Sequence, residues 1–241
     1  MITIKTVKNT IWFSLILQII TGLIPLPGLF IKLDEKDAIL SDILVLETIV
    51  QFIELLFYVW IAFSVMNIKK MASRRYIDWM ITTPTMLLST IMFMKYQERK
   101  ENNELENKPL KTMGFIKENK DLILKIFGFN FLMLLFGYLG EINTISKYIA
   151  IPIGFGFFYK SFELIFNNYA SVTAKGRNLF LFLVSVWSLY GISAMMPLVQ
   201  KNTAYNILDI VAKNFYGLFI YYYITKVGTR KGYFLNFIKK E

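Results

Sequence analysis

Long apolar stretches dominate the chain, and short polar segments separate them. A bilayer core about 30 Å thick needs roughly 20 apolar helical residues to cross it. Seven stretches reach about that length, covering residues 8–25, 43–67, 72–95, 119–140, 145–168, 174–199 and 203–228. The pattern predicts an all-α bundle of seven transmembrane helices, built as a single domain over residues 1–241.

The first stretch follows Lys5 and Lys8, which is also how a signal peptide begins. No small-residue cleavage pattern comes after it, so we predict a membrane span. Pro25 and Pro27 should end this helix, because proline cannot continue it.

The connections predict how the helices are arranged. Those at 68–71, 141–144 and 200–202 are very short, so the helices they join should be antiparallel neighbours. The longest connection, 96–118, is polar and mixed in charge, and we expect a solvated loop there.

The distribution of charged residues predicts how the helices are oriented across the membrane. The chain carries 27 Lys and Arg against 17 Asp and Glu, a net charge of +10. On a soluble protein this excess would suggest nucleic acid, but here the basic residues punctuate apolar runs, so the expected partner is a lipid bilayer and not nucleic acid. With the N-terminus outside, 16 Lys and Arg lie in cytoplasmic segments and 8 in outer ones. We therefore predict that the N-terminus is outside and that the C-terminus, with the Lys-rich segment 226–241, is cytoplasmic.

The chain has no cysteine and no histidine. Disulfides, Cys/His zinc sites and histidine triads are therefore excluded, and we expect neither a metal site nor an enzyme. Proton chemistry would have to use carboxylates, hydroxyls, tyrosine, lysine or water.

Four ionisable residues lie deep in predicted spans, where charge is costly and usually functional: Glu54, Asp78, Asp209 and Lys213. Asp209 is one helical turn before Lys213. The two could form a structural ion pair, or Lys213 could form a Schiff base with a lipophilic aldehyde.

Asp78 shares a helix face with Thr82 and Ser89, and Ser89 is about 16 Å further along the axis. This polar stripe indicates a proton or ion route, although a stripe that holds helices together is an alternative.

Four segments resemble the microbial (type 1) rhodopsins, most closely the proteorhodopsin-like branch. They are RYIDWMITTPTMLLS (Arg75–Ser89), MLLFGYLGE (Met133–Glu141), WSLY (Trp187–Tyr190) and YNILDIVAKNFYGL (Tyr205–Leu218). The Asp-Thr-Ser triplet at 78, 82 and 89 also resembles rhodopsins of giant viruses.

The resemblance implies that Lys213 holds all-trans retinal as a protonated Schiff base. It implies that Asp78 is the counterion and proton acceptor, that Asp209 is a second counterion, and that Arg75 lies on their outer side. Thr82 would hydrogen-bond Asp78. The other residues implied to surround the retinal are Trp79, Thr83, Met86, Met133, Gly137, Phe157, Trp187 and Tyr190, with Tyr58 near Asp209.

Two residues depart from the usual outward pump. Ser89 stands where such pumps carry a carboxylic proton donor, so reprotonation should be slow or use another group. Glu54 could be a neutral acid that holds helices together, a substitute donor or an ion gate. Asp78 argues against a chloride pump.

The resemblance therefore predicts a light-driven outward proton pump in a cell membrane, as a homo-oligomer. Two alternatives stay open. A photosensor would signal to a membrane partner, and a light-gated channel would give photocurrents that reverse with voltage.

Overall fold

The computed structural model describes residues 3–63 and 68–230, which are almost entirely helical and contain no strand. Seven helical crossings account for most of the chain. They are α1 (Ile4–Leu23), α2 (Ile39–Phe63), α3 (Ile68–Glu101), α5 (Lys120–Glu141), α6 (Lys147–Ile165), α7 (Ala174–Ala194), and a last crossing made of α8 (Leu198–Asp209), η4 (Ile210–Asn214) and α9 (Phe215–Arg230). The short elements are η1 (Leu26–Phe30), η2 (Glu35–Asp37), α4 (Thr112–Glu118) and η3 (Phe166–Ala170).

Six crossings are long and apolar enough to span a membrane, in the described part of the chain. The seventh is interrupted at η4, a π-helical turn that contains Lys213. A π turn holds an extra residue and often marks a functional site. The predicted all-α transmembrane bundle is therefore confirmed, with its last helix irregular where the chemistry is expected.

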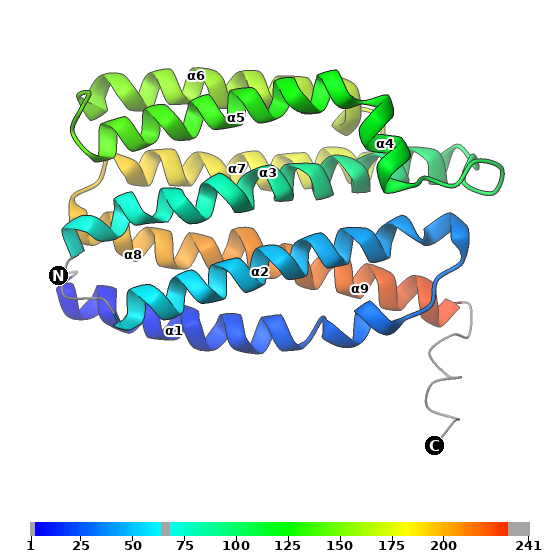
Figure 1. Ribbon diagram of the computed structural model, residues 1–241, viewed down its shortest axis with the longest axis horizontal. Coiled ribbons are helices and arrows are strands. Elements are labelled where there is room, and N and C mark those ends of the chain that lie inside the picture. The colour runs from blue at the N-terminus through cyan, green and yellow to red at the C-terminus, as the bar shows by residue number, and fades with distance from the viewer. Residues whose placement is uncertain (1–2, 64–67, 231–241) are drawn as a thin grey trace.

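Figure 1 shows the crossings running side by side along one long axis. α5 and α6 form a closely packed pair, α2 packs against α1 and α3, and α8 packs against α1 and α7. α1 begins at one end of the bundle and α9 ends at the other, as an odd number of crossings requires.

The structure corrects several predicted connections. Residues 68–71 belong to α3, and 64–67 lie outside the described residues. Residues 200–202 belong to α8, because the chain turns earlier, at 195–197, where Pro197 caps α8. The predicted loop 96–118 is partly helical: α3 continues to Glu101, and α4 lies within it. The turn after Glu141 is where the sequence predicted it. The Lys-rich end is described only as far as 230.

The bundle is apolar outside and partly polar inside. Large apolar side chains such as Phe13, Phe52 and Phe63 are more than half exposed, which suits contact with lipid. Many polar side chains are instead buried between the helices. A buried charge needs a partner or a proton, so the interior is where function should be sought.

Candidate functional site

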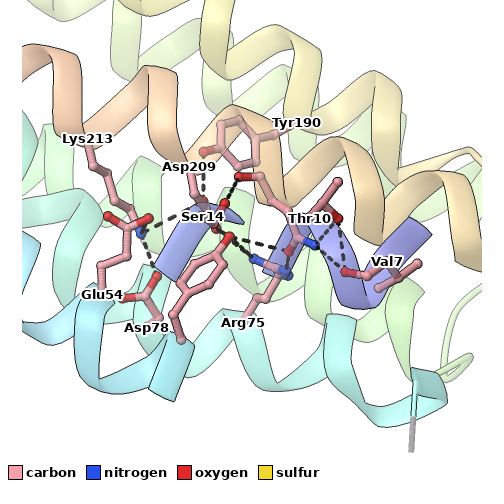
Figure 2. A network of polar contacts seen from close by, with 11 residues as sticks. Val7, Thr10, Ser14, Glu54, Arg75, Asp78, Tyr190, Asp209 and Lys213 are labelled. Carbon is pink, nitrogen blue, oxygen red and sulfur yellow. Dashed lines mark hydrogen bonds and ion pairs between the residues drawn. The ribbon is translucent and has the colours of Figure 1, made fainter. Parts of the chain in front are cut away.

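Lys213 is the centre of the buried polar interior. Its side chain, 2% exposed, extends from η4, and Nζ donates a hydrogen bond to Oδ2 of Asp78 at 2.6 Å (Figure 2). Glu54 Oε1 is 3.8 Å from Nζ, and Asp209 Oδ1 is 3.9 Å away. Three helices, α2, α3 and α8, thus bring a carboxyl group to one amine. This amine stands where a Schiff-base nitrogen would be.

Asp209 is tightly held. Arg75 Nη1 donates to its Oδ2 at 2.6 Å, and Tyr58 donates to the same oxygen at 2.8 Å. Tyr190 donates to the other oxygen at 2.8 Å. Charge-assisted bonds of this kind are the strong ones, so both carboxyl oxygens of Asp209 already have strong donors.

Asn206 extends this network to α1. Its Oδ1 accepts a hydrogen bond from Arg75, and its Nδ2 donates to Oγ1 of Thr10 at 2.8 Å. Ser14 donates to the Asn206 backbone carbonyl at 2.6 Å (Figure 2). Hydrogen bonds therefore connect the first and last crossings beside Arg75.

Asp78 has far fewer partners than Asp209. Its Oδ2 accepts from Lys213, and its Oδ1 has no hydrogen-bond partner among the described residues. Thr82, predicted to bond Asp78, does so only through the main chain: its hydroxyl donates to the Asp78 backbone carbonyl at 2.9 Å. A helical threonine readily bonds the carbonyl four residues earlier. The Asp78 carboxylate thus keeps a free oxygen.

Ser89 leads to a residue that the sequence reasoning missed. Its hydroxyl donates to Oε1 of Glu47, a completely buried side chain on α2. Glu47 lies seven residues, two turns, before Glu54, so the two share a face of α2. That spacing was the signal that could have identified Glu47.

A cavity lies between α3, α5, α6, α7 and the last crossing, and Lys213 is the one charged side chain among the described residues that line it. Trp79 on α3 and Trp187 on α7 belong to its walls. Of the residues predicted around the retinal, the lining contains Trp79, Thr83, Met86, Met133, Gly137, Trp187, Tyr190 and Lys213.

Two of the residues named in the sequence analysis are outside this lining. Tyr58 is not in the lining but beside Asp209, as already described. Phe157 stacks on Phe129 and Phe136 instead, and α6 contributes Phe155 and Phe158 to the lining. Residues three apart share a helix face, and Phe157 falls between these two positions. The register of α6 therefore corrects this prediction.

The lining fits retinal chemically. It is mainly aromatic and aliphatic, as a polyene requires, and it contains one amine able to form a Schiff base. The described residues contain no group of side chains that could hold a metal ion.

Comparisons with known proteins identify the family and the fold. The family model "Bacteriorhodopsin-like protein" matches residues 7–227. The viral rhodopsin OLPVRII is 26% identical, with a TM-score of 0.79, and the match covers 92% of this chain and 98% of that one. No curated protein matches the chain.

Two further solved structures share the fold. The blue light-absorbing proteorhodopsin from Med12 is 15% identical with a TM-score of 0.70, covering 91% of this chain and 97% of that one. Xanthorhodopsin, described as a light-driven ion pump with dual chromophore, is 18% identical with a TM-score of 0.70, covering 95% and 96%.

Proposed function

The chain belongs to the bacteriorhodopsin-like family, and we propose that it is a light-driven outward proton pump. Proteins of this family bind retinal through a lysine Schiff base, and here Lys213 would hold it in the all-trans form. The observation that carries the proposal is the buried pair of Lys213 Nζ and Asp78 Oδ2, 2.6 Å apart, at a cavity that fits the chromophore.

Asp78 is the better proton acceptor of the two aspartates. When bound, retinal supplies light absorption and an isomerisation that reorients the N–H bond at Lys213. Lys213 Nζ would then give its proton to a carboxylate within hydrogen-bond reach. Asp209 already accepts bonds from Arg75, Tyr58 and Tyr190, whereas Asp78 has an oxygen without a partner among the described residues. Of the two aspartates, Asp78 is therefore better placed to accept the proton.

Arg75 would direct the released proton outward. It lies one helical turn before Asp78 on α3, toward the end of the bundle where α1 begins. Its guanidinium joins Asp209 to Asn206, which contacts α1. A positive group there disfavours the return of a proton from that side.

Glu47 would return the proton to Lys213 from the other side. Ser89 lies eleven residues after Asp78, about 16 Å toward the opposite end of the bundle. Its hydroxyl bonds Glu47, a fully buried acid that could supply the proton a serine cannot. We therefore assign Glu47 as internal donor, with Ser89 positioning its carboxyl group.

The test is the pH of a weakly buffered suspension of cells that express the protein with all-trans retinal. Illumination should acidify the medium, and a protonophore should abolish the change. Asp78→Asn should shift absorption to the red and stop transport, while Asp121→Asn, the same change at an exposed position, should leave both unaltered. Lys213→Ala should give no pigment. Undiminished acidification by Asp78→Asn would refute the proposed acceptor.

One observation favours a light-gated channel as the second candidate. Glu47, Gln51, Glu54 and Tyr58 form a continuous buried file along α2. On α1, which packs against α2, Gln18 is also buried, and neither of its amide atoms has a hydrogen-bond partner among the described residues. Hydrated polar files of this kind could conduct ions. Photocurrents that reverse sign with voltage would select the channel, and currents of one sign would select the pump.

A further inference from the structure

A second recess lies at the end of the bundle where α3 ends, α7 begins and α9 ends (Figure 1). It is separate from the chromophore cavity, and the two share no lining residue. Three lysines from three different helices line this recess: Lys100, Lys175 and Lys226. Its floor is aromatic and aliphatic.

The three ammonium groups have no anionic partner in the described part of the chain. Lys100 Nζ donates to the neutral hydroxyls of Tyr96 and Tyr223, at 3.1 and 3.2 Å. Lys175 Nζ donates to the Gln97 side-chain oxygen at 3.2 Å. An ammonium has three donors, so both lysines keep some unused.

Aromatic rings bring these cations together. Lys100 and Lys175 both lie over the ring of Tyr223, at 5.1 and 5.7 Å from its centre, and Lys226 lies 5.9 Å from the ring centre of Tyr222. Lys95, earlier on α3, has a carboxylate partner instead: it pairs with Glu98 at 2.7 Å. Asp37 is reached only through the Tyr96 hydroxyl. Convergence of three cations without a directly paired carboxylate therefore leaves a local positive charge that an anion would neutralise.

The apolar part of the recess continues onto the outer surface of α9. Phe215 is 50% exposed and Phe219 is 39% exposed, and both belong to the lining. On a transmembrane helix such exposed rings face lipid chains. Cations at the rim and an apolar wall leading into the bilayer are complementary to a molecule with an anionic head and an acyl chain.

We propose that this recess binds an anionic glycerophospholipid. Lys100, Lys175 and Lys226 hold the phosphate, and one acyl chain lies along Phe215 and Phe219. The free phosphate ion would match the lysines but not the apolar wall. The site does not depend on the direction or nature of transport, so it stands apart from the proposed pump.

Native mass spectrometry of the retinal-loaded protein in detergent tests the proposal. Phosphatidylglycerol should bind at least about tenfold more tightly than phosphatidylcholine with the same chains, since its headgroup is a net anion, whereas the choline ammonium offsets the phosphate charge and is repelled by the lysines. The variant K100Q/K175Q/K226Q should lose that preference. The matched variant K117Q/K120Q/K125Q, which removes three exposed lysines from α4 and α5, should keep it.

Three outcomes would overturn the proposal: equal binding of the two lipids, equal loss in both triple variants, or displacement of phosphatidylglycerol by millimolar inorganic phosphate. The visible absorption band reports whether each variant is folded. If K100Q/K175Q/K226Q does not form pigment, Lys226→Gln alone decides the matter, because Lys226 is exposed and should lose part of the preference without disturbing the bundle.

Discussion

At the scale of single residues, the charges around Lys213 do not cancel. Lys213 and Arg75 supply two positive charges, while Asp78, Asp209 and Glu54 could supply three negative ones. An unbalanced charge in a buried cluster is expensive, so one proton should reside on a carboxyl group. Glu54 is best suited to hold it, because neither of its oxygens accepts a hydrogen bond from a described residue.

Glu54→Gln should therefore leave the colour almost unchanged. Glutamine resembles neutral glutamic acid in shape and charge, so the field at Lys213 stays the same. Asp78→Asn removes a negative charge 2.6 Å from the nitrogen and should shift absorption clearly to the red. Absorption spectra of the two purified variants make the comparison. A red shift in Glu54→Gln as large as that in Asp78→Asn would mean that Glu54 is ionised.

Glu47→Gln should slow the recovery of the pigment after illumination and should leave its absorption maximum unchanged. If Glu47 returns the proton, its loss should slow recovery of the unilluminated pigment by about a hundredfold, the usual worth of a positioned proton donor. Flash photolysis measures this recovery, and added azide should restore it, because its conjugate acid, hydrazoic acid, is a small diffusible proton donor. Glu163→Gln is the matched control, because Glu163 is paired with Lys160 away from the site. An unchanged recovery rate in Glu47→Gln would exclude it as donor.

Sequence reasoning located most of this cluster but not Glu47. Asp209 and Lys213 are one turn apart on one helix, and the polar stripe of α3 also lies within one helix. Sequence spacing alone is therefore enough to predict that those residues lie close together. Glu47 looked like a charge near a helix end, because the second span was predicted to start at 43. α2 in fact begins at Ile39, which places Glu47 two turns inside a buried face. Its contact with Ser89 joins two helices, and periodicity in one helix cannot reveal that.

At the scale of elements, hydrophobic periodicity predicted the crossings better than their ends. Residues 68–71 and 200–202 are polar enough to suggest loops, yet tertiary packing keeps them helical. The π turn at Ile210–Asn214 left no sign in the sequence, because an extra residue in a helix does not change its composition. Packing of the last crossing against α1 and α2 must favour it.

Two glycines show how packing between elements limits substitution. A Cβ added at Gly28, in η1, would come within 2.6 Å of the Tyr221 ring and 2.8 Å of Leu44. A Cβ at Gly128, within α5, would meet nothing within 4 Å. Gly28→Ala should destabilise the protein by about 1–3 kcal/mol through overpacking. Gly128→Ala should stabilise it by up to about 1 kcal/mol, because alanine favours the helix.

Thermal bleaching of the pigment measures both glycine variants on one scale. The temperature at which half of the pigment is bleached should fall for Gly28→Ala and rise or stay constant for Gly128→Ala. A fall of equal size in both would show that helix geometry, and not contact between η1, α2 and α9, sets the cost.

At the scale of the whole molecule, the direction of transport depends on how the bundle sits in the membrane. Arg75 and the start of α1 lie toward one end, and Ser89, Glu47 and α4 lie toward the other. The excess of Lys and Arg predicts that the second end is cytoplasmic. The proposed donor would then face the cytoplasm, and the proposed release path would face outward.

The absence of native cysteine makes this orientation directly testable. Thr144→Cys and Met113→Cys place single thiols at exposed positions near opposite ends of α5, and Met113 is 65% exposed. In intact cells a membrane-impermeant maleimide should label Thr144→Cys, and it should label Met113→Cys only after permeabilisation. The retained pigment colour checks the fold of each variant. The reverse labelling would mean that the bundle has the opposite orientation in the membrane. Glu47 would then take protons from outside, and the protein would be an inward pump.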